Sequence, residues 1–258
     1  MLAASQRSFV GTSAALFAAS TALTIKWCNS MSAMHDMSMP GGWSMSMMWM
    51  RMPGQTWPGV ATAFLGMWLV MMAAMMLPAL ATMLWRYRSA VAGNARIDAL
   101  TVLVAAGYFL VWMLFGAVAF LAGAILASLE MQLPALARAV PGAVGAVVLI
   151  CGILQFSPWK AHHLACCRAT PDCCELLRED ARSAWRHGLR LGLHCVYCCL
   201  GLTTVLLVVG SMDLRAMAIV TAAISLERLA PGGERAARFT GLVLVVAGLS
   251  LIAKAAVA

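Results

Sequence analysis

The residues with the clearest chemical potential are cysteines and histidines that gather in two stretches of the chain. The first stretch, residues 158–175, holds six soft or borderline metal ligands: His162, His163, Cys166, Cys167, Cys173 and Cys174. Thiolate sulfur and imidazole nitrogen are ligands that copper and zinc accept readily. If this stretch is helical, His163 and Cys167 lie one turn apart and can share an ion.

The second stretch comprises His194, Cys195, Cys198 and Cys199. The three cysteines are spaced three and four residues apart, so their thiols lean toward one face of a helix. Seven of the nine cysteines fall in these two stretches, which is more crowding than cysteines acting as small apolar residues would show. Metal binding is the favoured interpretation, and redox-active thiols and structural disulfides are the alternatives.

A third set of soft ligands consists of nine methionines in the twenty-two residues from Met31 to Met52, here called the Met-rich segment. Thioether sulfur suits Cu(I) and needs no deprotonation. The alternative is an interfacial apolar loop anchored by tryptophans, and either way we expect little regular structure. The candidate ligands in this segment are Met34, His35, Met37, Met39, Met45, Met47 and Met48.

A methionine stripe follows on the next apolar stretch, at Met67, Met71, Met72, Met75 and Met76. Residues spaced by four share a helix face, so these thioethers would line one side of a membrane helix. Packing is the commoner role for such a stripe. Its continuity with the Met-rich segment favours an access path, which Pro78 would loosen.

The elements that must position these ligands are membrane helices. The 258 residues are 62% hydrophobic and 11% charged, whereas ordinary globular chains are about a quarter charged. Their mean hydropathy is +0.86. A spanning helix needs about 20 apolar residues, and seven stretches approach that length: 8–25, 60–84, 99–128, 139–157, 191–212, 214–226 and 236–257. The sixth is short, so we expect an all-α polytopic transmembrane bundle of six or seven spans.

Lysine and arginine counts in alternate loops set the orientation. With a cytoplasmic N-terminus, thirteen of the 18 basic residues lie on the cytoplasmic side and five on the other. We therefore expect residues 1–30 to be an N-terminal membrane anchor or signal-like helix, and residues 31–58 to be a Met-rich extracytoplasmic loop. Residues 59–258 would form the helical membrane domain, with a Cys/His-rich loop at 158–190. The dispersed arginines argue against nucleic-acid binding.

Common catalytic patterns are missing from the sequence. It contains no phosphate-binding glycine loop, no nucleophile motif and no H-E-x-x-H. Glu227 is a lone carboxylate at the end of the sixth apolar stretch, where it could pair with Arg228 or a loop arginine. A non-enzymatic role is therefore expected over an enzymatic one.

Several motifs taken together resemble the bacterial family known as domain of unknown function 2182 (DUF2182), described as predicted metal-binding integral membrane proteins. The motifs lie at Gly66–Pro78, Gly107–Trp112, Gln155–Lys160, Leu164–Arg168, Gly192–Cys199 and Leu226–Arg228. The family pattern usually has Cys where this chain has His163, and Gly then Trp where it has Tyr197 and Leu200. The resemblance implies a multi-pass protein of the bacterial inner (cytoplasmic) membrane that binds metal, and it implies no reaction.

These observations predict a membrane protein that handles copper by capture, delivery or transport, with zinc as the alternative metal. The expected partners are the lipid bilayer, the metal ion and a membrane or periplasmic protein. Two other functions remain open at this point. The chain could be a membrane redox enzyme, as a thiol oxidoreductase or a copper-dependent oxygenase, or it could be an accessory subunit of a larger membrane complex.

Overall fold

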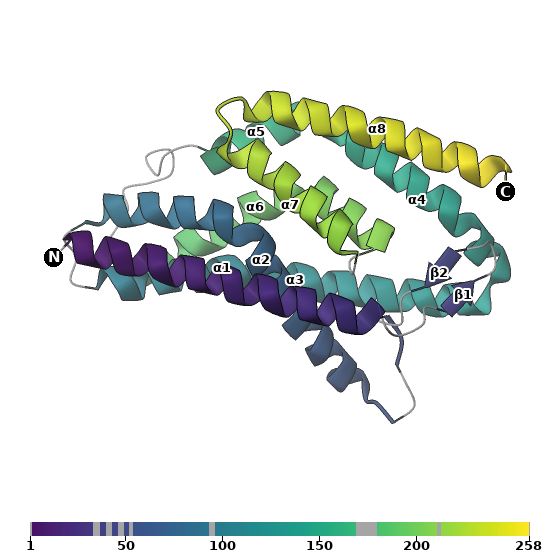
Figure 1. Cartoon of the computed structure of the whole chain (residues 1–258), viewed down its shortest axis with the longest axis horizontal. Helices are drawn as coiled ribbons and strands as arrows, with labels where there is room; N and C mark the ends of the chain where they lie inside the picture. Colours follow the sequence, from purple (N-terminus) through teal and green to yellow (C-terminus); the bar gives the residue numbers. More distant parts are fainter. Residues whose placement is uncertain are drawn as a thin grey trace.

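The protein is an assembly of long helices, shown as a computed structural model in Figure 1. The structure describes residues 2–32, 37–39, 43–45, 49–51, 54–92, 96–168, 180–210 and 213–257. The helices in these ranges are α1 (Leu2–Ser32), α2 (Trp57–Ala90), α3 (Ile97–Gln132), α4 (Pro134–Leu154), α5 (Pro158–Arg168), α6 (Ala181–Gly210), α7 (Leu214–Leu229) and α8 (Gly233–Val257). The all-α prediction is confirmed.

Six of these helices are long and apolar enough to cross a membrane: α1, α2, α3, α4, α6 and α8. They correspond to six of the seven predicted apolar stretches. The remaining stretch, the sixth in chain order at 214–226, is helix α7 of 16 residues. It rises about 24 Å and falls short of a typical hydrocarbon core of about 30 Å. Helix α7 lies among the longer helices (Figure 1) and buries Met217, Ile224, Glu227 and Arg228. The chain is a multi-pass membrane protein.

The segment predicted as a loop at 158–190 is largely helical where the structure describes it. Helix α5 begins at Pro158, directly after α4, and α6 begins at Ala181, ten residues before the predicted span. The polar residues of these turns misled the sequence interpretation, because helices that extend beyond the hydrocarbon region carry charged side chains in their outer turns. Both Cys/His stretches therefore lie, at least in part, on helices.

Two short strands occur where no regular structure was expected. β1 (Met37–Met39) and β2 (Trp43–Met45) pair antiparallel, with Ser38 opposite Ser44. The Trp43 indole donates a hydrogen bond to the carbonyl oxygen of Ala137 at 2.9 Å, which ties the ribbon to the start of α4. The Met-rich segment is thus attached to the membrane domain at the end where α3 meets α4 (Figure 1).

Two helix pairs form the frame that positions the ligands. Helices α4 and α8 lie side by side along their length (Figure 1), and α3 packs closely on α6. A Cβ atom added at Gly188 of α6 would lie 2.3 Å from the carbonyl oxygen of Val104, so only glycine permits this backbone approach of α6 to α3. The first half of α6 is thereby fixed against α3.

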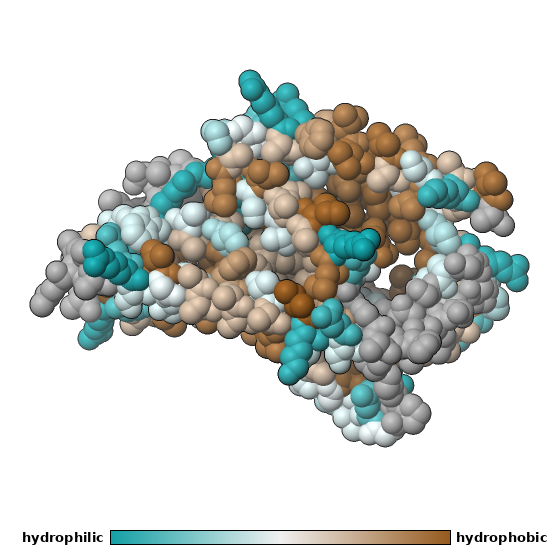
Figure 2. Space-filling model, viewed as in Figure 1, coloured by the Kyte–Doolittle hydropathy of each residue, from teal (hydrophilic) through white to brown (hydrophobic). Residues whose placement is uncertain are grey.

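The outer surface of the helices is apolar. Val102 and Val118 of α3 and Phe239 of α8 are each about two-thirds exposed, at 66%, 65% and 69%. Figure 2 shows hydrophobic residues gathered over α4 and α8, with hydrophilic residues in separate patches elsewhere on this face. Side chains of this kind need lipid as their solvent, which agrees with the membrane spans.

Candidate metal centre

Helix α5 is amphipathic, and it divides its ligands between two faces. Lys160, Leu164 and Cys167 are buried, at spacings that place them on one side of a helix. His162 and Cys166, four residues apart, are exposed on the other side, with the His162 Nε2 atom 3.7 Å from the Cys166 sulfur. The first Cys/His stretch therefore does not form a single site in the described residues.

Three further thiols approach Cys167 from helix α6. Cys195, Cys198 and Cys199 are 0%, 1% and 1% exposed, because the face of α6 that carries them packs into the core. The thiols interact in series, Cys167 with Cys198, Cys198 with Cys199, and Cys199 with Cys195. We call these four residues the thiol cluster. The predicted convergence of the α6 cysteines on one helix face is confirmed.

Tyr108 of α3 closes the far end of this series. Its hydroxyl oxygen lies 2.9 Å from the Cys195 sulfur, and its side chain is fully buried. The close packing of α3 on α6 holds the two groups together, because a Cβ at Gly192 would lie 3.0 Å from the Tyr108 carbonyl oxygen. A phenol beside a thiol can donate a hydrogen bond to the sulfur and so favours a thiolate there.

Cys167, at the other end of the series of thiols, is in an environment that favours the protonated thiol. The hydrogen bond between the Cys167 thiol and Cys198 raises the pKa of Cys167, and burial raises it further. Cys167 is therefore a protonated donor, and the Cys198 sulfur is the acceptor. Cys167 therefore contributes a proton, and not a negative charge, to the thiol cluster.

A buried cation faces the thiol cluster. Arg228 of α7 is 7% exposed, and within the part of the chain that the structure describes none of its three guanidinium nitrogens has a hydrogen-bond partner. Its charge acts on Cys195, Cys167 and Cys199. A guanidinium buried without a partner is strongly unfavourable. The arrangement is favourable only when the thiol cluster carries negative charge.

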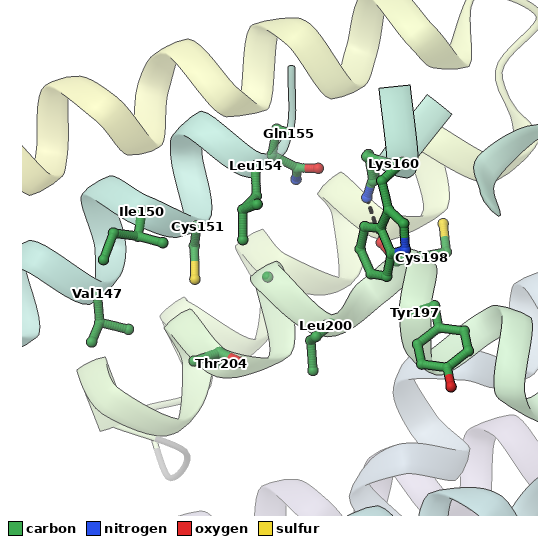
Figure 3. Close-up of a pocket in the computed structure, with 12 residues that line it drawn as sticks. Val147, Ile150, Cys151, Leu154, Gln155, Lys160, Tyr197, Cys198, Leu200 and Thr204 are labelled. Atoms are coloured by element: carbon green, nitrogen blue, oxygen red, sulfur yellow. Dashed lines mark hydrogen bonds between the residues drawn. The ribbon is translucent and has the colours of Figure 1, made fainter. Parts of the chain in front are cut away.

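A separate ion pair fixes the three helices that form the site. The Lys160 ammonium of α5 lies 2.7 Å from a carboxylate oxygen of Glu227 in α7, and both side chains are almost completely buried. Lys160 also donates to the Cys198 carbonyl oxygen, which appears as the dashed line in Figure 3, and Gln155 donates to Glu227. Glu227 thus pairs with Lys160, and not with Arg228 or a loop arginine as the sequence suggested. This pairing leaves the Arg228 charge for the thiols.

A set of imidazoles lies beside the buried thiols, with His162 exposed and His163 and His194 half-buried. The Nδ1 atoms of His163 and His194 are 3.3 Å apart, and the rings of His163 and His162 are also in contact. Burial lowers the pKa of His163, and its histidine neighbours lower it further. It is therefore neutral at pH 7, which is the form that binds metal. We call His162, His163, His194 and Cys166 the imidazole group.

Two nitrogens that share a copper or zinc ion at about 2.0 Å each are about 3.3 Å apart when the angle at the metal is tetrahedral. The separation of His163 from His194 has this value. Yet within the described residues no three His, Cys, Asp or Glu side chains converge closely enough to surround one ion. Both the thiol cluster and the imidazole group therefore offer pairs of ligands.

A cavity of about 250 Å³ lies beside the thiol cluster, between α4, α5 and α6. Figure 3 shows Cys151, Ile150 and Leu154 on one side of it and Thr204 and Leu200 on the other. Cys198 and Lys160 also line it. The cavity thus lies between the thiol cluster and helix α4.

The structure describes only some of the remaining predicted ligands. Met34, His35, Met47, Met48, Cys173 and Cys174 lie outside the described residues, and the backbones of Met37, Met39 and Met45 lie in the two strands. A metal role for these residues stays a prediction. On α2, Met71, Met72, Met75 and Met76 are all buried in the main core.

Most of the sequence matches the model of a known protein family. Residues 65–251 match the model of the PpoB2 family, whose description is copper chaperone. The chain belongs to this family. The matched span contains the thiol cluster, the imidazole group, Tyr108 and Arg228, whereas the Met-rich segment lies before it. No curated protein and no solved structure matches the chain. Membership in the PpoB2 family agrees with copper handling in general, and the resemblance to DUF2182 stays a prediction.

Sequence reasoning assigned no role at the site to Tyr108 or Lys160, and it treated Arg228 only as a partner for Glu227. One signal was available for Arg228, because an ionisable residue among apolar helices is a functional candidate by default. The pairing of Tyr108 with Cys195 joins residues 87 positions apart and depends on how α3 packs on α6. No local spacing reveals such a contact.

Proposed function

We propose that this protein is a membrane-embedded copper chaperone, with Cu(I) as its cargo and the thiol cluster as the holding site. The single observation that carries the proposal is the Arg228 guanidinium, which is buried without a hydrogen-bond partner beside four buried thiols. Thiolates are soft ligands that favour Cu(I). The membership in a copper chaperone family supports the same assignment.

Charge balance favours Cu(I) over zinc at this position. A Cu(I) ion held by two thiolates carries one negative charge, which the Arg228 cation neutralises. Zn(II) with two thiolates is neutral and would leave the buried guanidinium uncompensated, and zinc also prefers four ligands. The thiol cluster offers pairs of ligands and a counter-charge, which suits a monovalent ion of low coordination number.

The imidazole group serves as the exchange site in this proposal. His163 is neutral at pH 7 and its Nδ1 atom lies 3.3 Å from that of His194, so His163 can accept an ion without losing a proton. Thiolates bind a soft ion more tightly than imidazoles do, so the ion is held at Cys198 and its neighbours and passes through the imidazoles during exchange. Each thiol that becomes a ligand releases its proton to water, and no electron is transferred.

The protein would deliver its cargo by the reverse exchange to a partner with thiolate or thioether ligands. Copper passes between such proteins through shared ligands, so the partner must reach the exposed side of α5. Cys166 and His162 lie on that side. Of the two partners expected from the sequence, a membrane protein is the one that could contact the exposed face of α5, because the predicted orientation places this face on the cytoplasmic side.

The decisive test is the variant Arg228→Met, measured in purified protein by competition with a coloured Cu(I) chelator. Removing an unpaired buried cation should raise the melting temperature of the copper-free protein, since the buried charge costs stability. The same change should weaken Cu(I) binding by about 100-fold. A purely structural arginine would give the opposite effect on melting.

Arg228→Lys is the matched control because it keeps the charge, and it should retain most of the Cu(I) affinity. The double variant Cys198→Ser and Cys199→Ser should lose tight binding altogether. If Arg228→Met binds Cu(I) as tightly as the unmodified protein, the counter-charge argument is wrong. If the cysteine double variant also keeps full affinity, the thiol cluster is not the holding site.

A further inference from the structure

A second group of sulfur atoms lies in the core, away from the thiol cluster. Cys28 of α1 and Met217 of α7 are 2% and 5% exposed, and their sulfur atoms are 3.9 Å apart. They belong to the same continuous core as the α2 methionines and the thiol cluster. The contact between Cys28 and Met217 plays no part in the thiol cluster as described above.

The distance between the two sulfurs suits a shared ion. Two sulfur ligands at about 2.3 Å from a metal are about 4 Å apart when the angle at the metal is trigonal. The observed 3.9 Å therefore needs almost no rearrangement to become a pair of ligands. Cysteine and methionine sulfurs together form a soft set that selects Cu(I) over harder ions.

A small cavity adjoins Cys28, and two methionines of α2 also line it. Its lining consists of Thr24, Trp27, Cys28, Met67 and Met71, from helices α1 and α2, and its volume of about 10 Å³ is near the lower limit for one water molecule. The Thr24 hydroxyl already donates to the Ser20 carbonyl oxygen at 2.8 Å. Thioethers and a thiol dominate the lining, which suits a soft ion better than water.

The location of this group connects it with the Met-rich segment. Cys28 lies in the last turns of α1, just before that segment begins. Met217 is in the first turn of α7, and Arg228 is in its last turn. Eleven residues of helix separate them by about 16 Å. The first turn of helix α7 thus carries a soft ligand and its last turn carries the cation that acts on the thiol cluster. Met72, Met75 and Met76 of α2 are buried in the same core.

We propose that Cys28, Met71 and Met217 form a second Cu(I) site, which receives the ion from the Met-rich segment before it reaches the thiol cluster. The inference rests on the proposed copper function and adds a direction to it. One thiolate and two thioethers around Cu(I) make a neutral complex, so this site needs no counterpart of Arg228. On binding, Cys28 releases its thiol proton to water, and the oxidation state of copper does not change.

Sulfur side chains also fill cores without binding anything, so the experiment must separate packing from ligation. The full chain in detergent is titrated without oxygen with Cu(I), supplied as its acetonitrile complex, against a competing chelator. Cys28→Ser should lower the number of tightly bound Cu(I) ions by one. The matched control is Cys151→Ser, which changes a buried cysteine in a different core region and should leave the number unchanged.

Met217→Leu tests the site without altering a cysteine. It keeps an apolar side chain of similar size, so the fold should persist while one sulfur ligand is lost. X-ray absorption of the bound copper should then show one sulfur neighbour fewer at this site. Met83→Leu on α2, a partly buried methionine outside the group, is the control and should leave the spectrum unchanged.

A variant with Ser at Cys167, Cys195, Cys198 and Cys199 distinguishes this inference from the proposed function. It should retain one tightly bound Cu(I) with sulfur ligands, which a further Cys28→Ser change should remove. If Cys28→Ser and Cys151→Ser bind the same amount of copper, the second site is wrong and the thiol cluster still stands. If the four-serine variant keeps all its copper, the thiol cluster is wrong.

Discussion

The two faces of helix α5 present similar ligands in opposite environments. On the buried face, Cys167 is hydrogen-bonded to Cys198, and Lys160 is locked to Glu227. On the exposed face, the His162 Nε2 atom lies 3.7 Å from the Cys166 sulfur, and the His162 ring contacts that of His163. The 11 residues of α5 therefore carry one set of buried groups and one set of solvent-exposed groups.

The difference shows how burial decides the function of a ligand. A buried thiolate needs a counter-charge and hydrogen bonds, and Arg228 and Tyr108 supply them on the inner side. An exposed imidazole or thiol is solvated by water and needs neither, so it can bind and release an ion without a change in the fold. The inner face is suited to holding copper and the outer face to exchanging it.

Among the changes to the buried face of α5, loss of the Lys160–Glu227 ion pair should have the largest effect on stability. Lys160→Met leaves the Glu227 carboxylate in the core with Gln155 as its remaining side-chain donor. We expect the free energy of unfolding to fall by about 3–5 kcal/mol, because an uncompensated charge stays buried. Thermal unfolding in detergent, followed by circular dichroism, measures the loss.

Two control variants make this comparison quantitative. His162→Ala, on the exposed face of the same helix, should change stability by less than about 0.5 kcal/mol. The double variant Lys160→Met with Glu227→Gln removes both charges and should recover part of the loss. An equal cost for Lys160→Met and His162→Ala would mean that the two faces do not differ.

Thiol accessibility sharpens the same comparison. In a protein with Ser at Cys173 and Cys174, a water-soluble maleimide should modify Cys166 at least about 100-fold faster than Cys167, which reacts only after local opening that costs about 3 kcal/mol. Mass spectrometry of peptides over time gives the two rates. Cys166→Ser should remove the fast phase alone. Similar rates at both positions would show that the inner face is open to water.

The sequence predicted much of this division, and its limits are physical. Hydropathy identifies the long membrane helices because lipid demands about 20 apolar residues in a row. The spacing of Cys195, Cys198 and Cys199 predicts their shared face, since helical geometry is local. The burial of Cys167 and the exposure of Cys166 were not predictable, because that division depends on how α5 packs against α6 and α7.

The interaction partners of the buried charged groups could not be predicted from the sequence either. Glu227 lies beside Arg228 in the chain, yet neighbouring residues on a helix point in different directions. The structure therefore pairs Glu227 with Lys160, 67 positions away, and turns Arg228 to the thiols. Sequence patterns locate such charges but cannot assign their partners, since those depend on contacts between distant helices.

Helix packing gives a third way to perturb the inner face. Gly188→Ala puts a methyl group 2.3 Å from the Val104 carbonyl oxygen, so α6 must move away from α3. The expected cost is about 1–3 kcal/mol of unfolding free energy. Gly66→Ala is the control, because a Cβ there meets nothing within 4 Å. Equal melting temperatures for the two variants would contradict the role of Gly188 in positioning the α6 thiols.

The smallest expected effect is that of a single hydroxyl group. Tyr108→Phe removes the group that lies 2.9 Å from the Cys195 sulfur and keeps the ring that fills the core. Losing one such hydrogen bond costs about 1 kcal/mol, or about fivefold in Cu(I) affinity, while the number of bound ions stays the same. Tyr197→Phe is the matched control, since its exposed ring packs on His163 and Trp159 on the outer side. Chelator competition should separate the two variants, because only the inner hydroxyl contacts a sulfur that holds charge. Equal affinities would mean that Tyr108 only fills space, and that Arg228 alone stabilises the thiolates of the inner face.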